Sequence, residues 1–324
     1  MRVLLLHSDV PPDAPPDEQD TLVTAEAVAK ALETRRHTVR RSPFTPDPET
    51  LDRLLAACAA EVVFNLVESV FGQGDLAGIA PAMLARRNIR FTGASAAATG
   101  CAADKPFTKK ILRAAGLPTP DWSEAPHWEG LAEGRSYVVK SATEDSSVGL
   151  SDEAVVQGPE AARRRASLSG KRYGGAWFAE AYCPGREFNV SLLEEQGGVR
   201  VLPIAEIEFS DWEPQRPRLV GYAAKWDEGS RDCAATGRVF GLEETAPELA
   251  ASLSAFSLSA WNLLAQRGYA RVDFRLDREG APTILEINPN PCLEPGAGFA
   301  AAALRADISY AELVERILEA AIRS

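Results

Sequence analysis

The stretch ARVDFRLDREGAPTILEINPN, residues 270–290, decides the fold. Its pattern of apolar and polar residues predicts two strands joined in a hairpin that turns at the Glu-Gly step. Residues i and i+2 of a strand share a face, so Arg271 projects with Asp273, and Glu286 projects with Asn288. Such a hairpin pairs Asp273 with Glu286 and Arg271 with Asn288, all on one side. A loop with an odd number of residues and no bulge would put them on opposite sides.

These side chains suit a magnesium site. Asp273, Glu286 and Asn288 supply hard oxygen ligands, which Mg²⁺ binds at about 2.0–2.1 Å and often shares with nucleotide phosphates. Facing carboxylates are unfavourable without a cation, and Arg271 could steady phosphate oxygens or a developing oxyanion. The alternative is a solvated hairpin face with unrelated charges. The apolar residues between the charges are expected to face the core: Val272, Phe274, Leu285 and Ile287.

A second candidate feature is a lysine followed by a small polar loop. The strand expected over 137–140 ends in Lys140, which can reach a phosphate as a point charge. Ser146, Ser147 and Gly149 in the loop let backbone amides approach phosphate oxygens closely. The loop matches neither a P-loop nor a G-x-G-x-x-G fingerprint. A flexible surface loop is therefore the alternative.

Other residues could complete a nucleotide site. Lys105 opens a predicted helix and Lys225 lies in the segment GYAAKW, although each alone is typical of a surface lysine. The segment 180–183, followed by Glu187, could form a nucleotide-sized slot. Its backbone groups would bind an adenine edge, and Glu187 would accept hydrogen bonds from ribose hydroxyls.

Composition limits the class of function. The chain has 324 residues and a formal net charge of −11, with a pI near 5.0. This charge argues against nucleic acid or an anionic membrane surface as a partner. No run of about 18 apolar residues occurs, so no membrane span is expected, and the short apolar stretch 3–6 reads as a strand rather than a signal peptide. The five scattered cysteines, without Cys-x-x-Cys, and the three histidines indicate neither a disulfide framework nor a zinc site. A reducing cytoplasm is the expected location.

Short strands alternate with helical stretches, which is typical of an α/β fold. We predict an N-terminal α/β lobe (1–103), a central lid lobe (104–184) and a C-terminal lobe with the metal hairpin (185–324). The expected strands are 3–6, 61–66, 89–92, 137–140, 177–181, 187–193, 199–209, 271–276 and 283–287, and the expected helices are 21–32, 80–87, 104–115, 249–267 and 311–322.

An ordered set of segments resembles the D-alanine–D-alanine ligase-like branch of the ATP-grasp superfamily. The first half carries VVFNL (62–66), FTG (91–93), DK (104–105) and AAGLPTP (114–120). The second half carries VVK (138–140), SSVG (146–149), PGREF (184–188), ARVDF (270–274) and LEIN (285–288). The resemblance implies an ATP-grasp fold of three lobes, the first an open Rossmann-like α/β lobe, with ATP bound between the last two.

The resemblance also implies roles for individual residues. The cofactors would be ATP and two magnesium ions, for which manganese could substitute, and the metal ligands would be Asp273, Glu286 and Asn288, with Glu286 bridging. Arg271, Ser146 and Lys225 would be catalytic. The nucleotide contacts would come from Lys105, Lys140, Ser147, Glu180, Tyr182, Cys183, Glu187 and Lys225.

The sequence departs from the family pattern where substrates would be chosen. The family's His-Gly after the second strand is Glu68-Ser69 here, and the tyrosine after the phosphate lysine is Trp226. The segment 289–299 replaces a small, hydroxyl-bearing segment. Its Glu294 would repel an acceptor carboxylate or attract an ammonium group.

The glutamate that grips the donor's amine in the family is not clearly matched, and Glu18 or Asp20 could serve instead. The candidate substrate residues are thus Glu18, Glu68, Trp226 and Glu294.

Together these features predict an ATP-dependent carboxylate–amine ligase that forms an amide through an acyl phosphate, releasing ADP and phosphate. Its small-molecule substrates would be non-standard for the family. The alternatives are a D-alanine–D-alanine ligase proper, a non-catalytic ATP-binding protein on the same scaffold, and phosphorylation of a carboxylate without an amine acceptor. The family often forms homodimers, which no sequence feature here establishes. The loop 143–151 and the segment 211–232 are candidate parts of a lid.

Overall fold

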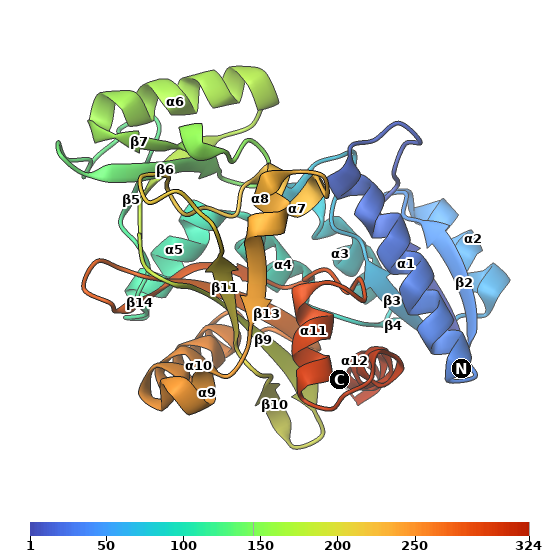
Figure 1. Cartoon of the computed structure of the whole chain (residues 1–324). Helices are drawn as coiled ribbons and strands as arrows, with labels where there is room; N and C mark the ends of the chain where they lie inside the picture. The colour runs from blue at the N-terminus through green and yellow to red at the C-terminus, as the bar shows by residue number, and fades with distance from the viewer. Residues whose placement is uncertain (145, 324) are drawn as a thin grey trace.

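The computed structural model describes residues 1–144 and 146–323, in which helices and strands build three separate sheets (Figure 1). The mixed α/β class predicted from the sequence is confirmed. No helix in this described part is long and apolar enough to cross a membrane. The predicted lobe boundaries stay a prediction, and the strands of the three sheets lie within 2–91, 122–181 and 187–288.

The N-terminal sheet is parallel and covered on both faces. Its order is β2-β1-β3-β4. Alternate residues of the two central strands pack against α1 on one face and against α2 and α3 on the other, which explains their unbroken apolar runs. The elements are β1 (Arg2–His7), α1 (Pro16–Thr34), β2 (Thr38–Pro43), α2 (Pro48–Cys58), β3 (Val62–Leu66), the 3₁₀ turn η1 (Gly74–Leu76), α3 (Ile79–Arg86), β4 (Arg90–Phe91) and α4 (Ala96–Ala103).

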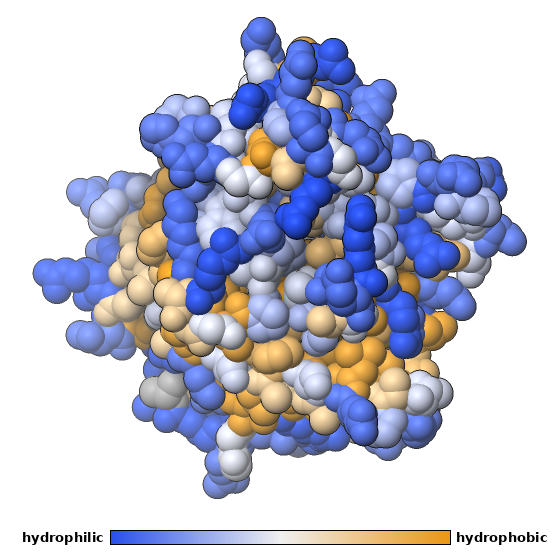
Figure 2. All heavy atoms as spheres, turned by 90° about the vertical axis from the view of Figure 1, so that its left-hand side faces the viewer, coloured by the Kyte–Doolittle hydropathy of each residue, from blue (hydrophilic) through white to orange (hydrophobic). Residues whose placement is uncertain are grey.

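The second sheet is antiparallel, with the order β5-β8-β6-β7. Helix α6 covers one of its faces through Ala162 and Ala166, and small side chains allow this close approach. The upper part of the face in Figure 2, where this lobe lies, is mostly hydrophilic. The elements are α5 (Lys105–Ala114), β5 (Trp122–Glu124), β6 (Ser136–Ser141), η2 (Asp152–Ala154), β7 (Val155–Gln157), α6 (Gly158–Tyr173) and β8 (Trp177–Ala181).

The third sheet has the order β12-β11-β9-β13-β14, with β10 paired to β9. Helix α10 packs on it through Leu253, Ala260 and Trp261. The strands are β9 (Glu187–Glu195), β10 (Gly198–Val201), β11 (Ala205–Phe209), β12 (Thr236–Val239), β13 (Tyr269–Leu276) and β14 (Pro282–Asn288). The helices are α7 (Tyr222–Trp226), α8 (Arg231–Ala235), α9 (Leu242–Thr245), α10 (Pro247–Leu263), α11 (Gly298–Arg305) and α12 (Tyr310–Arg323).

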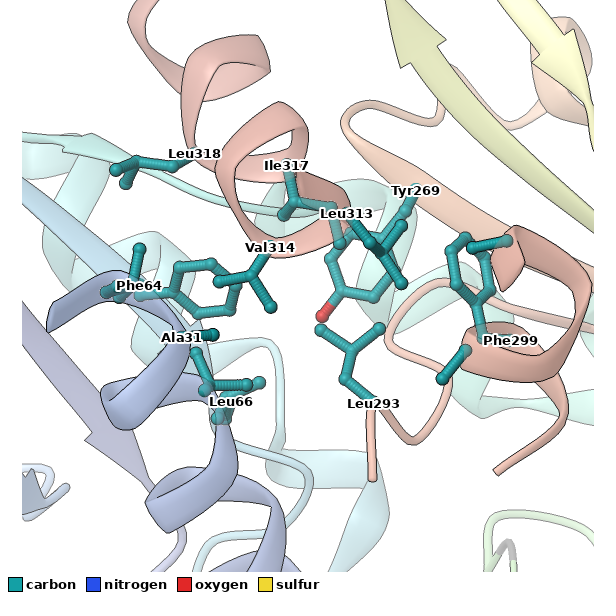
Figure 3. Close-up of a cluster of buried hydrophobic side chains, with 14 of the residues drawn as sticks. Ala31, Phe64, Leu66, Tyr269, Leu293, Phe299, Leu313, Val314, Ile317 and Leu318 are labelled. Carbon is teal, nitrogen blue, oxygen red and sulfur yellow. The ribbon is translucent and has the colours of Figure 1, made fainter. Parts of the chain in front are cut away.

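The last helix, α12, packs between the N-terminal sheet and the C-terminal sheet. Figure 3 shows side chains of α12, among them Leu313 and Val314, between Phe64 of β3 and Tyr269 of β13. All four side chains are fully buried. The C-terminal sheet and the N-terminal sheet therefore share one hydrophobic core.

Three predicted elements were clearly wrong in extent. The helix expected over 21–32 is α1, which starts earlier, at Pro16, and ends at Thr34. The single strand expected over 199–209 is two strands, β10 and β11, because Pro203 lies between them and cannot donate to a ladder. The helix expected over 249–267 starts earlier, with Pro247 in its first turn, and ends at Leu263. Ala265 just beyond has a positive φ of 48°, which a continuing helix does not allow.

Candidate active site

Every predicted site residue lines a single cleft of about 1930 Å³. Its walls come from strands of the second and third sheets, from α1 and α4 of the N-terminal part, and from the loops between these elements. The cleft therefore brings together side chains that are far apart in the sequence, from Glu18 in α1 to Glu294 after β14. Their roles stay predictions, but their common location is the one that the sequence pattern required.

The metal hairpin has the predicted pairing. Arg271 lies opposite Asn288, and Asp273 lies opposite Glu286. Beyond Asp273 the register shifts, which makes Leu285 the extra residue of a β-bulge. The connecting turn has an odd number of residues, and the bulge compensates for it. Without the bulge the acidic pair would be broken.

The same bulge corrects one expectation. Leu285 was predicted to face the core with its apolar neighbours, and this was wrong, because it lines the cleft and is only half-buried. Val272, Phe274 and Ile287 do lie in the core beneath the hairpin. The extra residue thus adds an apolar side chain to the wall of the cleft.

Asp273 is held from two sides. Both carboxylate oxygens accept hydrogen bonds from Arg271, Nε to Oδ1 at 2.7 Å and Nη2 to Oδ2 at 2.7 Å. Asn189 on the neighbouring strand β9 donates from Nδ2 to Oδ1 at 2.8 Å. Because Asp273 is only 6% exposed, its charge depends on these partners.

Glu286 lies in the most positive part of the cleft. Burial alone would raise its pKa, but the charges of Lys105, Lys140, Lys225 and Arg271 outweigh burial and lower the pKa to about 2. Cations from four elements, α5, β6, α7 and β13, thus converge around one carboxylate, and they keep it ionised, which is the form that binds a metal.

The donor set fits magnesium. Asp273, Glu286 and Asn288 present two carboxylates and one carboxamide oxygen to the cleft, and the Asn288 oxygen also accepts from the Asn290 N–H at 2.9 Å. Within residues 1–144 and 146–323, no group of three or more His, Cys, Asp or Glu could hold a metal. A metal here would therefore depend on ligand oxygens as well, and Mg²⁺ commonly shares its shell with phosphates and water.

Glu180 has a different neighbourhood from the one expected. Its carboxylate is 3% exposed and contacts two lysines, Lys109 and Lys140, the latter at 2.8 Å. Burial lowers the pKa of Lys109 to about 8, although Glu180 opposes this shift. The side chain of Glu180 thus holds Lys140 and Lys109, and in the backbone that follows it the Tyr182 N–H donates to the Ser136 carbonyl and the Cys183 carbonyl accepts from Arg275.

Two predicted lid segments meet across the cleft. Ser147 Oγ donates to the Val220 carbonyl at 3.0 Å, and Trp226 Nε1 donates to the Ser146 carbonyl at 2.9 Å. Ser146 and Ser147 both have positive φ, 58° and 62°, which is uncommon for residues other than glycine. Residue 145 of the predicted loop lies outside the described residues.

Tyr222 connects all three parts of the molecule. Its N–H donates to the Leu150 carbonyl at 3.0 Å, in the serine loop. Its hydroxyl donates to Asp17 Oδ1 at 2.7 Å, in the first turn of α1. Burial and the Asp17 carboxylate raise the pKa of Tyr222 to about 12, so the hydroxyl remains a donor at ordinary pH.

The substrate end of the cleft is crowded with acidic groups. Glu294 Oε2 accepts from the Gly296 N–H at 2.7 Å and so caps its own turn. Cys292 Sγ donates to Asp20 Oδ2 at 3.1 Å, and burial raises the pKa of this thiol. Burial also raises the pKa of Glu18.

One cation faces this acidic end. Arg238 of β12 donates to the Gly296 carbonyl at 3.0 Å. Within the described residues, it forms no ion pair with a carboxylate, and it lines the cleft. Glu68 lies at the same end, where its N–H donates to Ser8 Oγ at 3.0 Å.

Sequence reasoning missed several lining residues. Arg275 lies two residues beyond Asp273 on β13, so the same alternation that grouped Arg271 with Asp273 could have placed it on that face. Tyr222, Arg238 and Cys292 were not singled out, because nothing near them in the sequence marks a site. Tyr222 begins the short helix α7, Arg238 lies in the edge strand β12, and Cys292 lies in the segment after β14.

Comparisons with known proteins identify the family and the fold. Residues 112–319 match the family model described as D-ala D-ala ligase C-terminus. The D-alanine–D-alanine ligase of Synechococcus sp. (strain JA-2-3B'a(2-13)) is 32% identical over 319 residues, which cover 95% of this chain and 90% of that protein. An uncharacterized protein y4sG of Sinorhizobium fredii (strain NBRC 101917 / NGR234) is 32% identical over 283 residues, 85% of this chain and 80% of that protein.

A solved structure has the same fold. The crystal structure of the D-alanine–D-alanine ligase from Bacillus anthracis complexed with ATP matches with a TM-score of 0.76 and 21% sequence identity, covering 100% of this chain and 97% of that one. The predicted ATP-grasp fold is confirmed. The chain therefore belongs to the D-alanine–D-alanine ligase family, and it is an ATP-dependent ligase that forms an amide bond.

Proposed function

We propose that this ligase joins a small carboxylic acid to a small amine, and that its substrates are not the pair of D-alanines named in its relatives. A carboxylate oxygen of the donor attacks the γ-phosphorus of ATP, the bond to ADP breaks, and an acyl phosphate forms. The neutral amine of the acceptor then attacks the acyl carbon, and the tetrahedral intermediate expels phosphate as the amine gives up one proton. Adenosine diphosphate, phosphate and the amide are the products.

The residues of the cleft position these groups and balance their charge. Lys105, Lys140 and Lys225 surround the place where the phosphates would lie, and phosphoryl transfer depends mainly on such positioning. Asp273, Glu286 and Asn288 would hold Mg²⁺, which supplies neutralisation of phosphate charge when bound. Arg271 extends toward the same space and could stabilise the oxyanion of the tetrahedral intermediate.

The acidic residues at the end of the cleft that holds the predicted substrate residues support the choice of an amine as acceptor. Glu18, Glu68, Glu294 and the Asp20–Cys292 pair all line that end, where a carboxylate-bearing acceptor would meet like charges. An acceptor amine, or a substrate with an additional ammonium group, is favoured there instead. Arg238 is the counter-charge that could hold a single anionic group.

The second candidate is a D-alanine–D-alanine ligase proper. Its support is the set of relatives with that name, for example the 32% identical protein of Synechococcus sp., which aligns over nearly the whole chain. The two candidates share the nucleotide end of the cleft and differ only at the substrate end.

A phosphate-release screen separates them. The protein is incubated with ATP, Mg²⁺ and amino acids of both hands, singly and in pairs, together with simple amines, and products are weighed by mass spectrometry. Our proposal expects release with an amine or a basic amino acid as acceptor and little with D-alanine alone. Release that requires D-alanine, with a D-alanyl-D-alanine product, would establish the second candidate. Glu286→Gln is the inactive control for contaminating phosphatases.

A further inference from the structure

We propose that Arg275 is a positioning residue of the nucleotide site, and that it sets the selectivity of this ligase for the ribose hydroxyls of ATP by fixing the Glu187 carboxylate. This inference rests on the proposed placement of ATP in the cleft. Arg275, Glu187, Tyr182 and Cys183 all line that cleft, and Arg275 is 3% exposed.

The geometry is that of a clamp. Arg275 lies directly opposite Glu187 in the pairing of β13 with β9. Its Nε donates to Glu187 Oε2 at 2.9 Å, and its Nη2 donates to the same oxygen at 2.6 Å. Its Nη1 donates to the Cys183 carbonyl at 3.0 Å. One guanidinium thus joins the candidate ribose acceptor to the segment that would bind adenine.

The clamp leaves a defined acceptor for the ligand. Both hydrogen bonds end on Oε2, and in the described part of the chain no donor contacts Oε1 of Glu187. The carboxylate is therefore held in one orientation with one oxygen available to a hydroxyl. A planar guanidinium is suited to this task, because its donors are fixed relative to one another, whereas a lysine offers a single movable charge.

A purely structural ion pair is the competing explanation, and the chain contains a comparison for it. Arg186, just before β9, also donates through Nε and Nη2 to a carboxylate, but to both of its oxygens, Oε1 of Glu206 on β11 at 2.7 Å and Oε2 at 2.6 Å. That pair joins neighbouring strands of the same sheet, but its residues do not line the cleft. Its arginine can therefore be changed without touching the nucleotide.

The test measures selectivity rather than activity. Equilibrium dissociation constants for ATP and for 2′,3′-dideoxy-ATP are determined with Mg²⁺ for the wild type, Arg275→Met, Arg275→Lys and Arg186→Met, together with the melting temperature of each. We expect the wild type to prefer ATP by about 10-fold or more, since hydrogen bonds to a charged group are among the stronger ones. Arg275→Met should reduce that preference to within about 3-fold, Arg275→Lys should fall between, and Arg186→Met should keep the wild-type ratio.

Three results would count against the inference in different ways. If Arg275→Met keeps the wild-type preference while binding ATP, the clamp does not set ribose selectivity. If Arg186→Met loses the preference for ATP as much as Arg275→Met does, the loss comes from a weakened sheet and not from the Arg275–Glu187 contact. If the wild type binds neither nucleotide, the proposed nucleotide site itself is wrong, which is a separate failure. If Arg275→Met does not fold, Arg275→Lys decides the question. A wild-type preference of Arg275→Lys for ATP over 2′,3′-dideoxy-ATP would show that the paired hydrogen bonds from the guanidinium are not needed for ribose selectivity.

Discussion

Removal of the Tyr222 hydroxyl should make the predicted lid open more often. Tyr222→Phe deletes the hydrogen bond to Asp17 that ties the predicted lid segment, residues 211–232, to α1. This bond has a charged acceptor and is part-buried, so we assign it about 1.5 kcal/mol, the lower end for such bonds. That corresponds to about a tenfold loss in the ratio of closed to open lid, because about 1.4 kcal/mol equals a factor of ten.

The expected consequence is wasted ATP. A closed lid keeps water from the acyl phosphate, so a lid that opens more often should release more ADP for each amide formed. The assay measures ADP and amide together, with the substrate pair that the screen identifies. In Tyr222→Phe the amide formed per ADP should fall several-fold, while the melting temperature changes by only a few degrees.

A double-mutant cycle supplies the control. Asp17→Ala should lower the same ratio, and the double variant should be no worse than the worse single variant, because both changes remove one bond. An unchanged amide-to-ADP ratio in Tyr222→Phe would refute the reasoning. Fully additive effects of the two changes would show that the residues act separately.

Three further outcomes follow from single contacts. Glu294→Ser should change which amines are accepted while the affinity for ATP stays the same, and an identical acceptor profile in the screen would remove Glu294 as a selector. Glu180→Gln leaves two buried lysines without their carboxylate and should lower the free energy of unfolding by about 3–5 kcal/mol, measured by denaturant titration; a change below about 1 kcal/mol would contradict the buried triad. Gly185→Ala would bring its Cβ to 2.5 Å from the Leu276 carbonyl oxygen and should lower the free energy of unfolding by about 1–3 kcal/mol. Gly197→Ala, whose Cβ meets nothing within 4 Å, is the matched control and should lower it less in the same titration.

The sequence was sufficient to predict the strands and helices that bury a clear apolar face. The hairpin pairing of Asp273 with Glu286 was predicted from side-chain alternation and a turn position, but in the structure the pairing also needs the bulge at Leu285, because the turn has an odd number of residues. The bulge was not predicted, because it depends on how the turn relaxes against the neighbouring strand, and local sequence carries no marker of it. The break at Pro203 was readable in principle, since proline cannot join a central ladder.

The nucleotide end of the cleft was more predictable than the substrate end. Lys140 and Glu286 lie at strand positions whose direction follows from periodicity. Tyr222 and Arg238 instead contact residues far away in the sequence, Asp17 and Gly296. Such contacts depend on how distant elements pack together, so a single sequence does not reveal them.

The account rests on the opposed carboxylates of the hairpin as a metal site. The most direct measurement is Mn²⁺ binding, in the presence of ATP, by electron paramagnetic resonance for the wild type, Asp273→Asn and Glu286→Gln, with thermal melting to verify the fold. We expect folded variants to bind the ion at least about 10-fold more weakly than the wild type, as the loss of a charged metal ligand requires. Wild-type Mn²⁺ affinity in folded Asp273→Asn and Glu286→Gln would contradict it.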